Sequence, residues 1–171
     1  IIKQILENSM EELNVLDRDI EKIKNIKAPF PRVSYTECID ILNKSGNQIK
    51  WGDDFGSPEE TYIASQFDMP VIVYGFPSEI KAFYMKRDPE NEKVVLGMDI
   101  LAPEGYGEII GGSEREIDIN TLLSRIKEEG LNQSDYEWFL DLRRYGSVPH
   151  SGFGMGLERV VAWICGISHI R

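Results

Sequence analysis

A segment near the end of the chain constrains its fold and function more than any other. Gly152, Gly154 and Gly156 alternate with other residues, and an apolar run containing Glu158 and Arg159 follows directly. Because glycine has no Cβ, the backbone here can approach a ligand closely. A helix that begins at this point would direct free N–H groups and the positive end of its dipole outward. Together with the planar, permanently charged guanidinium of Arg159, the pattern predicts a nucleotide site.

The glycines follow neither of two common nucleotide-binding patterns. No Gly-Lys-Ser/Thr follows them, as it would in a P-loop, and no strand pattern directly precedes them, as in dinucleotide-binding folds. A glycine-rich turn also serves many purely structural purposes. The surrounding residues must therefore decide between a site and a turn.

Length and composition describe one domain, or a large part of one, with a real core. The chain has 171 residues, 42% of them hydrophobic, and no apolar run reaches the roughly 18 residues of a membrane span. No signal-peptide pattern opens it, so we expect a cytoplasmic protein without a membrane partner. The net charge of −10 argues against nucleic-acid binding through this part alone, because phosphates require clustered Lys and Arg. Cys38 and Cys165 are expected to be reduced thiols, and a disulfide between them is the alternative.

Amphipathic patterns predict six helices. Apolar residues recur at helical spacing over residues 2–26, and the capping boxes Ser34…Glu37 and Ser134…Glu137 each open a helix. Ser57 is the expected N-cap of another helix, and Gly166 ends the last one. The expected ranges are 2–26, 34–42, 57–67, 120–129, 134–144 and 157–165.

Four strand-like runs with short links predict an antiparallel sheet, at residues 71–74, 81–86, 94–101 and 107–116. Helices gathered on such a sheet make an α+β fold. The last run is unusual, because the Gly111-Gly112 pair weakens a strand unless a bulge or a close approach requires it. Side-chain alternation would place Glu108 and Arg115 on opposite faces of a regular strand, and a bulge at the glycine pair would bring them to one face. We expect that bulge; a solvated edge strand is the alternative.

Residues 152–159, Gly-Phe-Gly-Met-Gly-Leu-Glu-Arg, closely resemble the third signature motif of the class II aminoacyl-tRNA synthetases. Residues 143–151, Arg-Arg-Tyr-Gly-Ser-Val-Pro-His-Ser, resemble the asparaginyl form of that region more than the aspartyl form. Further stretches that resemble asparaginyl enzymes follow in order along almost the whole chain, at 28–35, 51–52, 80–85, 95–103 and 107–116. The resemblance implies part of the class II catalytic core, an antiparallel sheet flanked by helices.

The resemblance also implies a site for ATP and Mg²⁺. Asp99 and Glu108 look like the carboxylates that hold Mg²⁺ on the ATP phosphates, and Arg159 looks like the arginine that faces adenine and reaches the γ-phosphate. Glu108 and Arg159 are the implied catalytic residues. Gly152, Gly154 and Gly156 would let the backbone pass close to adenosine, with His150 beside them. The alternatives are a strand-end turn former for Asp99 and an ordinary loop residue for His150. Glu158 is expected to be an orienting partner or a helix cap rather than a reactive acid.

Three further residues look like the amino-acid pocket of this family. Arg115 corresponds to the arginine that contacts the side-chain carbonyl of the amino acid, and Lys81 and Tyr84 to pocket residues around it. The alternatives are a surface ion pair of Arg115 with a neighbouring glutamate, an exposed strand lysine and a core aromatic ring.

The implied activity is that of an asparagine–tRNA ligase. The carboxylate of asparagine attacks ATP to give asparaginyl-adenylate and pyrophosphate, and the asparaginyl group then passes to tRNA(Asn). A carboxylate is already a nucleophile, so catalysis is expected from alignment and charge stabilisation. In this family the full-length enzyme works as a homodimer.

The chain also departs from the family pattern. The first motif, at the dimer interface, and the second, which supplies an arginine and an aromatic ring to ATP, have no counterpart in residues 1–171, nor does an anticodon-binding domain. We therefore expect a C-terminal portion of a catalytic domain that forms no adenylate by itself and tends to associate. The alternatives are a related asparagine synthetase that adenylates aspartate, an aspartyl-tRNA synthetase, and a non-catalytic nucleotide-binding module.

Overall fold

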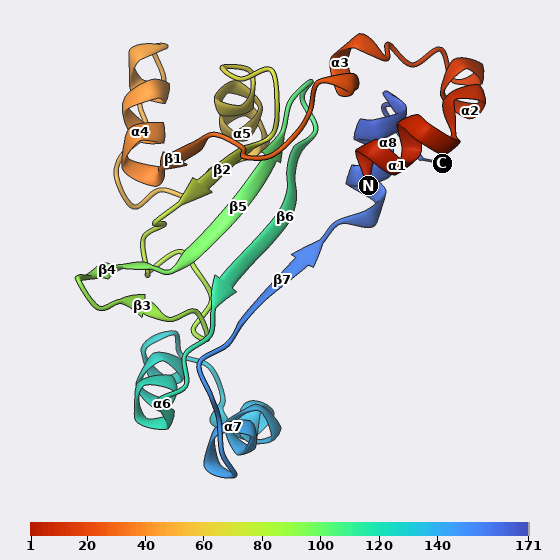
Figure 1. Ribbon diagram of the computed structural model, residues 1–171. Helices are drawn as coiled ribbons and strands as arrows, with labels where there is room; N and C mark the ends of the chain where they lie inside the picture. Colours follow the sequence, from red (N-terminus) through yellow and green to blue (C-terminus); the bar gives the residue numbers. More distant parts are fainter. Residues whose placement is uncertain (171) are drawn as a thin grey trace.

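A five-stranded sheet forms the centre of the computed structural model, which describes residues 1–170 (Figure 1). The strand order is β1-β2-β5-β6-β7, with β1 parallel to β2 and the remaining pairs antiparallel. The bounds are β1 Arg32–Ser34, β2 Val71–Tyr74, β5 Gly97–Ala102, β6 Gly107–Glu114 and β7 Ser151–Met155. A separate hairpin pairs β3 Arg87–Asp88 with β4 Asn91–Val95. The predicted α+β class is confirmed.

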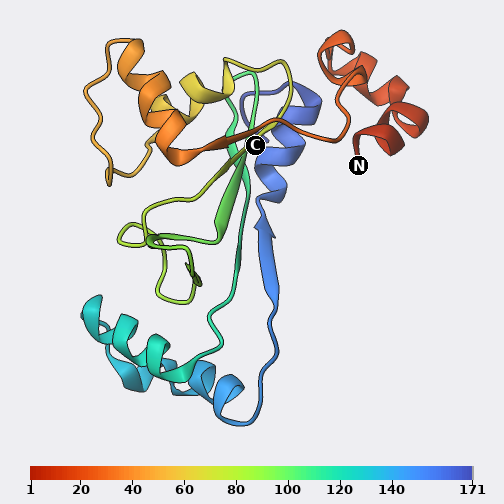
Figure 2. The ribbon, with the colours of Figure 1, turned by 60° about the vertical axis from the view of Figure 1, so that its left-hand side comes forward.

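Helices lie on both faces of this sheet (Figure 2). One face carries α4 Tyr35–Lys44 and α5 Ser57–Ala64, and the other carries α8 Leu157–Cys165. The three N-terminal helices, α1 Ile2–Asn8, α2 Met10–Val15 and α3 Glu21–Lys24, lie on the side of α8. Of the helices in residues 1–170, none combines the length and apolar composition needed to span a bilayer.

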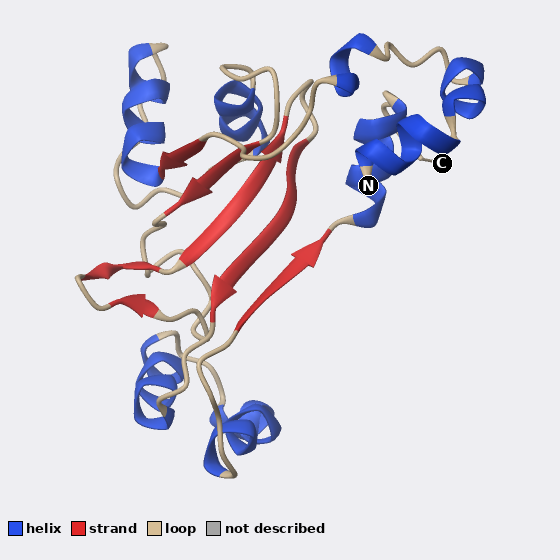
Figure 3. Ribbon diagram, in the orientation of Figure 1, coloured by secondary structure: helices blue, strands red, loops and turns tan. Residues whose placement is uncertain are grey.

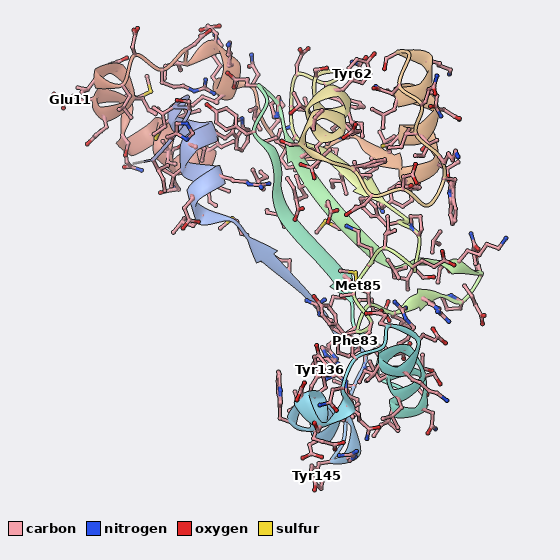
Figure 4. All side chains as sticks on the ribbon, turned by 180° about the vertical axis from the view of Figure 1, so that it is seen from behind. Glu11, Tyr62, Phe83, Met85, Tyr136 and Tyr145 are labelled. Atoms are coloured by element: carbon pink, nitrogen blue, oxygen red, sulfur yellow. The ribbon has the colours of Figure 1, made fainter. Side chains whose placement is uncertain are left out.

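The connection between β6 and β7 is a helical excursion beyond the end of the sheet (Figure 3). It comprises α6 Ile119–Glu128, the 3-10 helix η1 Gln133–Tyr136 and α7 Glu137–Arg144. Phe83 anchors it, since its ring stacks edge-on at 4.9 Å from the ring of Tyr136, and both lie where the sheet meets the excursion (Figure 4). The excursion therefore packs against the segment of the chain that contains Phe83.

Side-chain alternation along β5 and β6 separates two apolar clusters. Leu101 packs with α4 and α5, whereas Ile109 packs with Val160 and Trp163 of α8. A third cluster joins Phe83 to the excursion. Burying each of these large side chains contributes about 1.5–3 kcal/mol. Cys38 is buried in the first cluster and Cys165 lies near the end of α8; both are free thiols, as expected.

The predicted helix over residues 2–26 is wrong, because the segment folds as three short helices. Asp17 adopts a left-handed backbone conformation (φ 55°), which turns the chain and directs Arg18 into the molecule. There Arg18 forms a bidentate ion pair with Glu104, and its Nε donates to the carbonyl of Ile164 at 3.0 Å. This tertiary contact outweighs the helical periodicity of the segment.

The predicted strand over residues 81–86 is also wrong, since these residues form turns. Arg125 of α6 donates to the carbonyls of Ser78 and Lys81, and the buried ring of Phe83 turns toward the excursion. The predicted strand 94–101 is interrupted at Leu96, whose N–H donates to the Lys86 carbonyl and so separates β4 from β5.

Helix starts are confirmed in part. The Ser34…Glu37 capping box is present, with Ser34 Oγ accepting from the Glu37 N–H at 3.2 Å. The Ser134 box is absent: Asn132 caps η1, and α7 begins at Glu137. Gly56 rather than Ser57 precedes α5, whose end at Ala64 is earlier than predicted. The final helix and its left-handed Gly166 (φ 70°) match the prediction.

Candidate active site

The predicted bulge in β6 is present, but its position was predicted wrongly. Ile100 pairs with Ile110 and Leu101 pairs with Glu108, so that the extra residue is Ile109 rather than a glycine of the 111–112 pair. Ile109 and Ile110 consequently both pack on the α8 side of the sheet. The expected consequence holds, because Glu108 and Arg115 line the same cleft.

The cleft has a volume of about 650 Å³ and a floor of bare backbone. Asp99 pairs with Gly111, and Gly111 pairs in turn with Gly154, in a row across β5, β6 and β7. A Cβ added to Gly154 would meet no atom within 4 Å. The residues that line the cleft are Lys81, Tyr84, Met85, Asp99, Glu108, Gly111, Gly112, Arg115, Phe153, Gly154, Met155 and Gly156.

One end of this floor is acidic. Asp99 is only 9% exposed, and its Oδ2 accepts from Lys81 Nζ at 2.6 Å. The same ammonium lies 3.9 Å from the centre of the Phe76 ring, in a cation–π arrangement. Lys81 is thus neither on a strand nor exposed: it holds the carboxylate at the edge of the cleft.

The second carboxylate at this end belongs to Glu108. Burial raises the pKa of Glu108, and the nearby charge of Asp99 raises that pKa further. A Cβ built on Gly111 would lie 2.7 Å from Glu108 Oε1 and 3.2 Å from Asp99 Oδ1, so both carboxylates border one small space. Two crowded carboxylates of this kind favour a bound cation.

These two carboxylates fit Mg²⁺. The ion prefers hard oxygen ligands and takes one or two carboxylates while it keeps several waters. Within residues 1–170, no cluster of three or more His, Cys, Asp or Glu side chains is arranged to hold a metal. Two carboxylates would leave the other coordination positions of such an ion to water.

The other end of the floor is basic. Arg115 donates to Ser113 Oγ at 2.6 Å, and its guanidinium lies 4.9 Å from the centre of the Tyr84 ring. Glu114 pairs with Lys86, so the alternative ion pair with Glu114 is not formed. A Cβ on Gly152 would lie 3.0 Å from the Arg115 guanidinium, which means that this glycine makes room for it.

Arg159 is exposed and lies beside the cleft rather than among its lining residues, and it donates to the carbonyl of Glu108 at 2.7 Å. The His150 side chain does not line the cleft, and its Nδ1 lies 2.8 Å from the carbonyl of Val148. The backbone carbonyl of His150 accepts a hydrogen bond from the backbone N–H of Arg115. Of the predicted residues, Lys81, Tyr84, Asp99, Glu108, Arg115, Gly154 and Gly156 therefore line the cleft. Arg159 and Gly152 lie beside it, Gly152 against the Arg115 guanidinium, and the His150 imidazole is turned away.

Several residues around the cleft escaped the sequence analysis. Phe76 lies in the Gly-Phe-Pro segment that follows β2, and Ser113 follows the Gly111-Gly112 pair, which drew attention to the backbone rather than to this hydroxyl. The Glu60 carboxylate accepts from the Glu108 N–H, although its position in the first turn of α5 suggested only a helix start. The segment 151–155, expected to be a loop, is the edge strand β7. Alternate glycines without β-branched residues hid that strand.

Residues 1–171 match the family described as tRNA synthetases class II (D, K and N). A cleft that joins paired carboxylates, arginines and a glycine floor agrees with that match, and the chain belongs to this family. Within it, the chain is 57% identical over its whole length to the asparagine–tRNA ligase of Pelotomaculum thermopropionicum. It spans about 40% of the length of that relative.

Solved structures give the same picture. The asparaginyl-tRNA synthetase of Pyrococcus horikoshii complexed with asparaginyl-adenylate is 56% identical, with a TM-score of 0.95 over 99% of this chain and 39% of that one. The aspartyl-tRNA synthetase of Entamoeba histolytica is 30% identical, with a TM-score of 0.86 over 99% of this chain and 36% of that one. The resemblance to asparaginyl rather than aspartyl enzymes is therefore confirmed.

Proposed function

We propose that this chain supplies the Mg²⁺, ATP and asparagine contacts of an asparagine–tRNA ligase. The observation that carries the proposal is the glycine floor with Asp99 and Glu108 at one end and Arg115 at the other. Similarity to a synthetase solved with asparaginyl-adenylate supports the same assignment. We also propose that the chain is a C-terminal portion of the catalytic domain, and that the complete protein is a cytoplasmic homodimer that charges tRNA(Asn).

In this proposal the asparagine side chain lies at the basic end. Arg115, held by Ser113 and by the face of Tyr84, is oriented to donate to the side-chain carbonyl of the substrate. The α-carboxylate then points along the floor toward the phosphates. Because that carboxylate is already charged, the site needs to align it rather than deprotonate it.

The nucleotide occupies the remainder of the floor. Gly154 and Gly156 would leave space for adenosine against the backbone, and the exposed Arg159 guanidinium beside the cleft would face adenine and reach the γ-phosphate. Asp99 and Glu108 would hold Mg²⁺, which when bound neutralises negative charge on the phosphates. His150 contributes at most a backbone contact through Arg115.

The test is substrate-dependent turnover by the complete protein. With ATP, asparagine but not aspartate should support pyrophosphate exchange, and asparagine should then be transferred to tRNA(Asn). Release of free asparagine from aspartate and ammonia would instead identify a related synthetase that amidates aspartate. Exchange with aspartate and transfer to tRNA would identify an aspartyl enzyme, and nucleotide binding without any turnover would identify a binding module.

A further inference from the structure

The backbone N–H and carbonyl of Glu108 are each held by a charged side chain, from two different helices. Its N–H donates to Glu60 Oε2 of α5 at 3.1 Å, and its carbonyl accepts from Arg159 of α8 at 2.7 Å. Glu108 pairs with Leu101 directly beside the register shift, next to the extra residue Ile109. Two helices on opposite faces of the sheet therefore hold the backbone of one residue beside the bulge.

The preceding residue is shaped around the Glu60 carboxylate. Gly107 has a left-handed backbone (φ 66°), and a Cβ there would lie 2.7 Å from Glu60 Oε2. The carboxylate thus occupies the space that a side chain at position 107 would take. Glu60 also lines a cavity of about 100 Å³ together with Lys81, Asp99 and Glu108, so that it lies directly behind the acidic end of the cleft.

We propose that Glu60 is a positioning residue that holds Glu108 in the bulged register. In a sheet, a shift of one residue turns a side chain to the opposite face. Without the acceptor on α5, the end of β6 can return to regular pairing, which carries the Glu108 carboxylate away from Asp99. The cation-binding role of Glu108 in this proposal rests on the proposed function. The hydrogen bond between Glu60 and the Glu108 N–H does not depend on it.

Two measurements on the complete protein separate these points. Amide hydrogen exchange, read by mass spectrometry over peptides that contain Glu108, reports the hydrogen bond. Electron paramagnetic resonance of Mn²⁺ in the presence of ATP reports the carboxylates. We expect Glu60→Ala to accelerate exchange at Glu108 and to weaken ATP-dependent Mn²⁺ binding about tenfold or more, which is typical for loss of an orienting partner.

The matched variants distinguish positioning from charge. Glu60→Gln keeps an oxygen acceptor and should retain both the slow exchange and the Mn²⁺ affinity, whereas Glu60→Asp keeps the charge but withdraws the oxygen and should lose both. Glu59→Ala removes a carboxylate from the same helix, one that accepts only from the Gly56 N–H, and should change neither.

Glu60→Ala with wild-type exchange and wild-type Mn²⁺ affinity would overturn the proposal. Equal loss of slow exchange and of Mn²⁺ affinity in Glu60→Gln and Glu60→Asp would also overturn it. If Glu60→Ala does not fold, the comparison of these two variants tests the proposal. Absence of ATP-dependent Mn²⁺ binding in the wild type would overturn the proposed function alone. Faster exchange in Glu60→Ala would then still support the positioning of Glu108.

Discussion

Lys81 Nζ lies 2.6 Å from Asp99 Oδ2, and this ion pair joins the proposed amino-acid pocket to the proposed cation site. Both side chains are largely buried, at 17% and 12% exposure. Loss of one partner from such a pair leaves the other charge without compensation and costs about 3 kcal/mol. We therefore expect Lys81→Met to lower the free energy of unfolding by about that amount, measured by urea denaturation of the complete protein.

The double variant Lys81→Met/Asp99→Asn tests whether the pair has more than a structural role. It leaves neither member of the pair charged, so its stability should recover part of the loss, while pyrophosphate exchange should remain low because Asp99 no longer offers a carboxylate to Mg²⁺. Recovery of exchange together with stability would show that the pair only supports the fold.

Gly154 offers a substitution that the protein itself should tolerate. Its backbone is extended and a methyl group there meets no atom within 4 Å, so Gly154→Ala should leave the melting temperature nearly unchanged. The methyl would nevertheless stand on the floor beside Gly111. We expect the KM for ATP to rise about tenfold or more, equivalent to about 1.4 kcal/mol or more of lost binding.

The control for this variant is Ser151→Ala on the same strand. Ser151 faces the opposite side of β7 from Gly154 because alternate residues point in opposite directions. Its substitution should leave the KM for ATP unchanged. An unaltered KM in Gly154→Ala would mean that the nucleotide does not lie over this floor.

Gly152, two residues earlier, should affect the other substrate. A Cβ there would lie 3.0 Å from the Arg115 guanidinium and displace it from the face of Tyr84. Gly152→Ala is therefore expected to raise the KM for asparagine more than the KM for ATP. Steady-state kinetics with each substrate varied in turn would measure both, and equal changes in the two constants would contradict the separation of the two ends.

The ion pair of Arg18 with Glu104 predicts a pH dependence of stability. The hydrogen bonds from Arg18 lower the pKa of Glu104 in the folded protein below its ordinary value of about 4.3. Its contribution is thus fully present above that value and is lost as the pH falls through the lower pKa of the folded state. Urea denaturation between pH 7 and pH 3 should show this loss.

Glu104→Gln provides the comparison for that measurement. The variant should be less stable than the wild type at pH 7, and the difference between the two should shrink as the pH falls below the ordinary pKa of a glutamate, because the wild-type carboxylate then begins to take up a proton on unfolding. A difference that stays constant over this range would contradict a contribution from the charge.

The parts of the fold that the sequence predicted correctly carry local signals. The Ser34…Glu37 capping box and Gly166 are determined by hydrogen bonds and backbone conformation within a few residues, and both appear as expected. The bulge was predicted because a regular strand would place Glu108 and Arg115 on opposite faces. This reasoning predicts that a bulge exists, but it does not predict its position at Ile109.

The parts that were mispredicted depend on distant contacts. The end of the predicted N-terminal helix is set by Glu104, which pairs with Arg18 from another part of the chain. Residues 81–86 look like a strand, but Arg125 of α6 binds the Lys81 carbonyl and holds them as turns. The role of Glu60 likewise depends on the backbone N–H of Glu108, which lies 48 residues further along the chain. Periodicity carries no information about such contacts.

The most direct test of the account is the position of a bound metal and nucleotide in crystals of the complete protein. Crystals grown with Mn²⁺, ATP and asparagine would show the metal by its anomalous scattering. We expect an anomalous metal peak next to the carboxylates of Asp99 and Glu108, with adenosine over Gly154 and the asparagine side chain at Arg115. A metal and nucleotide bound away from the β5–β6–β7 cleft would contradict it.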